Sequence, residues 1–139
     1  SRIRGKNTKP ELTLRSLLHR QGFRFRLHCR ELPGRPDIVF PRHKAVVFVH
    51  GCFWHGHACR YFRWPASRPE FWRTKIGRNQ FNDAAALDAL QQMGWRVAVV
   101  WECAMRGKSV QDVNDLGAAV GAWLASSDAV SLVLPVELS

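Results

Sequence analysis

Residues 49–62 (VHGCFWHGHACRYF) contain three histidines, two cysteines and four aromatic residues. Cys52, His57 and Cys59 follow the spacing C-x4-H-x-C, which provides three of the four ligands of a tetrahedral zinc site. Cys103 is the only cysteine further along the chain and completes the set. A zinc ion with four protein ligands has no open position, so we expect its role to be structural. The alternative is a pair of buried thiols beside unrelated histidines.

Two further histidines, His50 and His55, are not needed by such a zinc site. His50 ends a predicted strand, and Asp37 lies in the neighbouring predicted strand, directly after Pro36. A carboxylate and a histidine on adjacent strands can hold a hard divalent cation and activate a water molecule. The alternative is a surface aspartate and a hydrogen-bonded histidine. We favour chemistry, because Asp37 occupies a strand position where an apolar residue would be more stable.

Composition describes the domain that must position these groups. The chain has 139 residues, which is the size of one domain, and 46% of them are hydrophobic, which is typical of a globular protein. No apolar stretch reaches the ~18 residues of a membrane span, and no signal peptide is recognisable. The net charge of +10 predicts a polyanionic partner, most simply nucleic acid, although solubility alone is the alternative.

The predicted elements alternate between helix and strand. Capping boxes at Thr8–Glu11 and Ser67–Glu70 open two helices, which Gly22 and Gly94 stop. A final helix is predicted around residues 113–124. Residues 95–101 are apolar and β-branched enough for a central strand. The other predicted strands cover residues 23–28, 37–40, 45–50 and 131–136. The expected fold class is α/β, with a mixed central sheet flanked by helices.

The second predicted helix carries a stripe of four residues at positions i, i+3, i+4 and i+7: Trp72, Lys75, Ile76 and Asn79. They lie on one face, so Lys75 and Asn79 can reach the edges of DNA bases together. The alternative is that the stripe belongs to the core. Lys75 and Asn79 argue against full burial of this face.

Several stretches of the chain are similar to one known family. The Pro36–Asp37 pair resembles half of the motif of restriction-endonuclease-like nucleases, whose acidic-x-Lys half is absent here. The stretches GKNTKPEL, LPGRPDIVF, VHGCFWHGHACRYF, FWRTKIGRN and GWRVAVVWECAMRG resemble the very short patch repair (Vsr) endonucleases. The resemblance implies a restriction-endonuclease-like fold and an enzyme that recognises T·G mismatches arising from 5-methylcytosine deamination. It nicks duplex DNA 5′ to the mismatched T and so initiates very short patch repair.

The resemblance also implies a role for each matching residue. Asp37 would bind a catalytic Mg²⁺, with the backbone carbonyl of Val49 as a further ligand, where the family usually has threonine. Glu11, His50 and His55 would be the other catalytic residues, with His55 our choice as the general base. Cys52, His57, Cys59 and Cys103 would hold the structural Zn²⁺. Phe53, Trp54 and Trp72 would wedge into the duplex beside the mismatch, and Lys75 and Asn79 would read it.

The implied partners are double-stranded DNA with a T·G mismatch and, by family resemblance, the mismatch-repair protein MutL. We expect one domain over residues 1–139, a monomer without membrane association, and a location at the nucleoid in the bacterial cytoplasm. Residues 1–7 are expected to be the stub of a segment that enters the minor groove. Two alternatives remain open: a restriction or homing-type endonuclease that cuts matched DNA on the same scaffold, and a zinc DNA-binding module without enzymatic activity.

Overall fold

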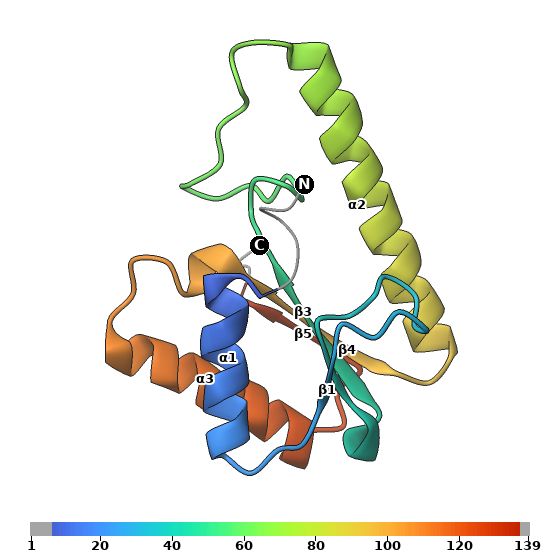
Figure 1. Ribbon diagram of the computed structural model, residues 1–139, viewed down its shortest axis with the longest axis vertical. Helices are drawn as coiled ribbons and strands as arrows, with labels where there is room; N and C mark the ends of the chain where they lie inside the picture. Colours follow the sequence, from blue (N-terminus) through green and yellow to red (C-terminus); the bar gives the residue numbers. More distant parts are fainter. Residues whose placement is uncertain (1–6, 137–139) are drawn as a thin grey trace.

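The computed structural model describes residues 7–136, in which a five-stranded mixed sheet is flanked by helices (Figure 1). Strands β1 to β5 follow one another in space in the order of the sequence. Neighbours are antiparallel from β1 to β3 and parallel from β3 to β5. The α/β class is therefore confirmed, and the architecture is compatible with a restriction-endonuclease-like fold. The strands are β1 (Arg26–Leu27), β2 (Ile38–Phe40), β3 (Ala45–His50), β4 (Arg96–Trp101) and β5 (Ser131–Leu134).

Successive side chains of a strand point to opposite faces, and those of the central strands are almost all apolar, so the sheet is apolar on both faces. One face packs on helices α1 (Lys9–Arg20) and α3 (Val110–Ser126), and the other packs on the end of helix α2 (Pro69–Gln92). Strands β3 and β4 are covered on both sides, as their continuous apolar sequences predict. The first core contains Leu14, Leu18, Ile38, Phe40, Val47, Val100, Val120 and Trp123, and the second contains Val39, Val46, Phe48, Leu90 and Val97.

Helix α2 is longer than the sheet that it covers. Leu87 and Leu90 pack against the sheet, whereas the N-terminal half of the helix extends past its edge beside the segment of residues 51–68 (Figure 1). Ile76 is the only buried residue of this outer half. Neither α2 nor another helix of residues 7–136 is long and apolar enough to cross a membrane.

Three local predictions need correction. Ser67 does not cap α2, because Arg68 is the N-cap residue, in a left-handed conformation (φ 55°) and without a capping bond from its side chain. Thr8 is the N-cap of α1, but its hydroxyl makes no capping bond. The predicted strand over residues 23–28 is reduced to β1, because Phe23 and Phe25 leave the ladder and pack edge-on against Phe40.

Arg96 joins the start of β4 to the end of α3. Its guanidinium donates hydrogen bonds to the carbonyl oxygens of His43, Trp123, Leu124 and Ser127 at 3.0–3.3 Å. It also lies 4.6 Å from the centre of the Trp123 ring. The last carbonyls of a helix have no partner within the helix, so this cation satisfies them and favours that end of the helix dipole.

We predict that Arg96→Ala lowers the free energy of unfolding by about 2–4 kcal/mol, because several half-buried carbonyls lose a charged donor. Urea denaturation followed by circular dichroism measures the change. Arg42→Ala, at an exposed position of the 3-10 turn Pro41–His43, is the control and should change stability by less than about 0.5 kcal/mol. Equal stability of the two variants would exclude this role of Arg96.

Candidate functional site

Four soft donors meet beyond the carboxyl ends of β3 and β4. The donor atoms of Cys52, His57, Cys59 and Cys103 all lie within 4.8 Å of one another. The His57 Nδ1 atom is 3.6 Å from the Cys103 Sγ atom. Tetrahedral zinc, with Zn–S of about 2.3 Å and Zn–N of about 2.0–2.1 Å, places sulfur and nitrogen ligands roughly 3.5 Å apart. The observed separation therefore fits two ligands of one zinc ion.

The parallel pairing of β3 and β4 explains why donors far apart in sequence meet. His50 pairs with Trp101, so the residues that follow both strands emerge at the same edge of the sheet. The His57 ring then stacks on Trp101 at 4.1 Å between ring centres and an interplanar angle of 6°. Gly56 permits the close approach of α2, since a Cβ atom there would lie 2.6 Å from the Cγ2 atom of Ile76.

The Cys52 and Cys103 thiols favour the neutral form unless a cation is bound. Burial raises the pKa of Cys52 far above its usual value, and the neighbouring thiols of Cys103 and Cys59 raise it further. Burial also raises the pKa of Cys103. Metal ligation requires thiolates, so a bound cation such as Zn²⁺ would offset the cost of holding several of them in this space.

His55 forms a dyad with Asp83 of α2. The His55 Nδ1 atom lies 2.5 Å from an Asp83 carboxylate oxygen. An Nδ1–H that donates to this carboxylate leaves the Nε2 lone pair free to accept a proton. The arrangement is that of an imidazole base oriented by a carboxylate.

His50 lies flat against His55, with the ring centres 3.8 Å apart and an interplanar angle of 8°. Burial, and then the nearby His55, lower the pKa of His50 to about 3. His50 is therefore neutral near pH 7, and its ring holds the plane of the His55 imidazole without repelling it by charge. Its buried Nδ1 atom has no hydrogen-bond partner among the described residues.

Asp37 lies directly before β2 and faces the same space. The backbone N–H of Val49 donates a hydrogen bond of 2.7 Å to an Asp37 carboxylate oxygen. Burial raises the pKa of Asp37 to about 7, against the lowering effect of this hydrogen bond, and the charge of Glu11 raises it further. The carboxylate is therefore under-compensated by the protein, which is the condition that a bound cation relieves.

Glu11 is buried beside Asp37, with 1% of its surface exposed. Its carboxylate accepts hydrogen bonds from Arg15 at 3.2 Å and from the backbone N–H of Asn7 at 3.1 Å, and lies 2.7 Å from the His28 Nε2 atom. The donor atoms of Glu11, His28 and Asp37 lie within 4.8 Å of one another. Through the contact with His28, the Glu11 side chain belongs to this cluster as well as to the first turn of α1.

A cavity of about 850 Å³ connects these groups. It lies between the segment that follows β1, the ends of β3 and β4, and helix α2. The candidate catalytic and cation-binding residues that line it are His28, Asp37, Val49, His50, His55 and Asp83. The Asp37 carboxylate and the imidazole of His55, oriented by Asp83, thus share one open cavity, an arrangement that suits hydrolysis of a phosphodiester.

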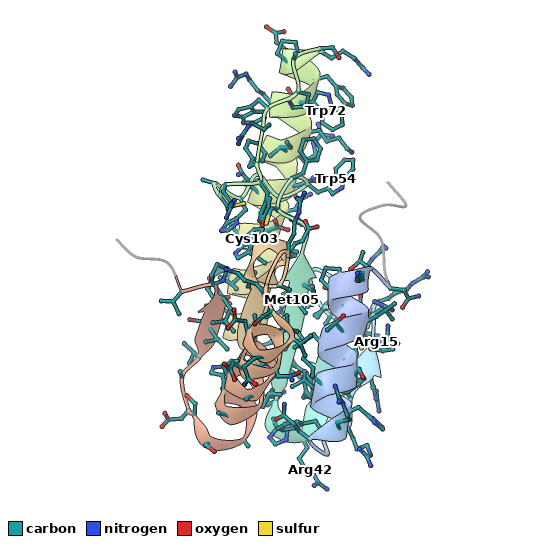
Figure 2. All side chains as sticks on the ribbon, turned by 90° about the vertical axis from the view of Figure 1, so that its left-hand side faces the viewer. Arg15, Arg42, Trp54, Trp72, Cys103 and Met105 are labelled. Carbon is teal, nitrogen blue, oxygen red and sulfur yellow. The ribbon has the colours of Figure 1, made fainter. Side chains whose placement is uncertain are left out.

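The three aromatic residues expected to form a wedge are in mutual contact. Phe53 lies 5.1 Å from Trp54 and 5.2 Å from Trp72, and the two tryptophans are 5.9 Å apart. All three are partly exposed, and Figure 2 shows Trp54 and Trp72 on the same side of α2. Insertion of these rings into DNA stays a prediction.

The helical stripe of α2 faces the segment that contains the zinc ligands. Ile76 is buried against it, whereas Lys75 remains partly exposed. The Asn79 side-chain amide donates a hydrogen bond of 2.8 Å to the Trp54 carbonyl. The core interpretation is therefore right for Ile76, and Asn79 has a structural contact in addition to its predicted one. Base contacts of Lys75 and Asn79 stay predictions.

Asp83 and His28 were not among the predicted site residues. Asp83 lies one turn after Asn79, so continuing the stripe of α2 by four residues would have found it. His28 had no comparable signal. It closed a predicted strand as an outward-facing residue, and only the fold brings it to Glu11.

Comparison with known proteins identifies relatives of this chain. The family model of DNA mismatch endonuclease Vsr matches residues 1–61. Type II nicking enzyme V.XorIIP of Xanthomonas oryzae pv. oryzae is 53% identical over 84% of this chain and 79% of its own length. DNA mismatch endonuclease Vsr of Escherichia coli is 44% identical over 91% of this chain and 81% of its own. Type II nicking enzyme V.NmeAIP of Neisseria meningitidis serogroup A is 43% identical over 78% of each chain.

We predict about one tightly bound zinc ion per chain, as one four-ligand site requires. Cys103→Ala should lower zinc content and thermal stability together, because a metal bound only by the folded state stabilises it. Metal analysis by mass spectrometry and a thermal melt measure the two effects. Cys29→Ala, a cysteine outside the cluster, is the control. Full zinc retention by Cys103→Ala would contradict the ligand assignment.

Proposed function

Because the chain belongs to the DNA mismatch endonuclease Vsr family, we propose that this nicking endonuclease recognises T·G mismatches in duplex DNA and cuts 5′ to the mismatched T. The mismatch would arise from 5-methylcytosine deamination, and the nick would initiate very short patch repair. The observation that carries the proposal is the cavity in which the His55–Asp83 dyad and Asp37 meet beside the aromatic residues.

In this proposal His55 is the general base. The Asp83 carboxylate fixes the imidazole by accepting the Nδ1–H, so the Nε2 atom takes the proton of the attacking water. His50 stacks on the ring and stays neutral, which keeps the pair from repelling each other when His55 gains a proton. An oriented base of this kind contributes about 10²–10⁴-fold to the rate.

The residues around Asp37 fit a divalent cation. Asp37 is a partly buried carboxylate with a raised pKa, and it lies beside the buried carboxylate of Glu11. Arg15 and His28 contact Glu11, whereas no salt bridge within residues 7–136 compensates Asp37. We propose Mg²⁺ as the ion, bound by Asp37 and the carbonyl of Val49, with Glu11 assisting through water. When bound, magnesium would neutralise charge that develops on the phosphate. Asp37, Val49 and Glu11 would in this way keep the phosphate near the His55 base.

The aromatic residues would supply mismatch recognition. A T·G wobble pair stacks poorly, so separating it from its neighbour costs less than separating a matched pair. Phe53, Trp54 and Trp72 are large, partly exposed and in contact, and they lie next to His55 in the same segment. Lys75 and Asn79 would read the mismatched bases. Zinc at Cys52, His57, Cys59 and Cys103 would hold the segment in place.

The remaining parts of the proposal concern the whole protein. We propose one domain over residues 1–139 that acts as a monomer on the nucleoid in the bacterial cytoplasm, with MutL as a partner. The proposed minor-groove segment falls largely on residues 1–6, which lie outside the described part of the chain. Asn7 is described and bonds to Glu11 and Arg15.

The decisive assay compares nicking of two duplexes that differ only in one T·G or T·A pair, with and without magnesium. We predict magnesium-dependent nicking of the T·G duplex alone. Asp37→Ala should abolish nicking and leave binding nearly intact, and Asp83→Asn should slow it by about 10²–10⁴-fold.

Each other outcome would indicate a different activity or a different active site. Nicking of both duplexes at equal rates would indicate a restriction or homing-type endonuclease that cuts matched DNA. Binding without nicking would indicate a zinc DNA-binding module. Undiminished nicking by Asp37→Ala would place the active site elsewhere.

The aromatic residues give an independent prediction. Trp72→Ala should weaken binding to the T·G duplex by about 1–3 kcal/mol, as expected for one lost base–aromatic stacking contact, and reduce discrimination against T·A. Zinc content should stay unchanged. Phe81→Ala removes a ring that is 73% exposed on the same helix and serves as the control. Full discrimination by a destabilised Trp72→Ala would make this tryptophan a core residue.

A further inference from the structure

The segment of residues 28–36, between β1 and β2, forms one wall of the cavity. Its first and next-to-last residues, His28 (φ 50°) and Arg35 (φ 49°), have left-handed backbone conformations. Residues other than glycine rarely adopt this conformation, and it persists where the surrounding structure enforces it. Both residues line the cavity. Two positions with left-handed backbone therefore lie in its wall.

The segment is held firmly at both ends. The N–H groups of His28 and Cys29 donate to the carbonyls of Asp37 and Pro36, at 3.0 and 3.3 Å. Leu32 packs on the second core, and its carbonyl accepts the Arg35 N–H at 3.1 Å. Cavity-lining side chains on this segment thus start from fixed backbone positions, as a binding site requires.

Two arginines of the segment, Arg30 and Arg35, line the cavity. Neither guanidinium has an ion-pair or hydrogen-bond partner within residues 7–136, whereas Arg15 is bound to Glu11 and Arg96 to four carbonyls. The acidic residue of the segment, Glu31, contacts the Cys29 thiol at 3.0 Å and does not line the cavity. Unpaired positive charge therefore lies in the wall of the same cavity as Asp37 and Asp83.

A polyanion must enter a cavity that contains two carboxylates if the protein cuts DNA there. We propose that Arg30 and Arg35 clamp backbone phosphates of the cut strand beside the scissile phosphate. This inference rests on the proposed function and adds the residues that bring the strand to the base. Arginine suits the task because its planar guanidinium binds two phosphate oxygens at once and stays charged at any working pH. The clamp offsets repulsion between the incoming phosphates and the carboxylates.

The test measures equilibrium binding of T·G and T·A duplexes as a function of salt, in buffer without magnesium. Arg30→Ala and Arg35→Asn should each weaken binding to both duplexes, on the order of tenfold at low salt, and reduce the slope of log K against log salt by about 0.9 for one lost phosphate contact. Arg42→Ala is the control, since this exposed arginine lies at the end of the molecule far from Trp54 and Trp72 (Figure 2). It should leave the slope unchanged.

Single neutral methylphosphonate linkages then locate the contact. At a linkage next to the cut site, the loss in affinity should be smaller in Arg35→Asn than in the wild type, because the two changes remove the same interaction. Additive losses at every linkage, or an equal slope change in Arg42→Ala, would overturn the clamp.

A purely structural role is distinguishable as well. Asparagine tolerates the left-handed conformation, so Arg35→Asn should keep the urea midpoint of the wild type. A lower midpoint with an unchanged salt slope would overturn the proposal. Nicking of the T·G duplex by the wild type reports separately on the proposed function, so either can fail without the other.

Discussion

The attachment of the segment after β3 to the end of β4 is the constraint on which the site depends. Between residues 51 and 80, only Cys52 and Ile76 are buried, so hydrophobic burial contributes little to holding this part of the molecule. The Cys52, His57, Cys59 and Cys103 cluster joins it to the central parallel strands instead. In the proposed account zinc replaces a core, as metals do in small or exposed substructures.

This constraint couples catalysis to recognition. Trp54 and His55 are adjacent in the chain, and both are held by α2: Asn79 binds the Trp54 carbonyl, and Asp83, one turn further, binds His55. One helix therefore positions a partly exposed aromatic ring and the proposed general base on the same short segment. A duplex that admits the ring would bring its backbone to the base, which explains why two metal ligands flank Phe53 and Trp54.

The sequence predicted the elements that carry strong periodicity and the cluster of four donors that carry strong spacing. Strands β3 and β4 and helices α1, α2 and α3 follow from apolar patterns and glycine stops, and Cys103 follows from an incomplete ligand set. Asp83 continues the stripe of α2, but its contact with His55 depends on the fold, as does the contact of His28 with Glu11, because each partner lies far along the chain. The capping box predicted at α1 does not form in detail because the Glu11 carboxylate is occupied by Arg15, His28 and the N–H of Asn7.

The most direct test of this account is hydrogen exchange of the wild-type protein before and after zinc removal, with nicking of a T·G duplex assayed on the same samples. The amides of His55, Gly56 and His57 bond to carbonyls within their own segment. We predict that these amides lose protection when zinc is removed, that nicking falls with them, and that β3 and β4 stay protected. Retained protection of these three amides, or undiminished nicking by zinc-free protein, would contradict the account.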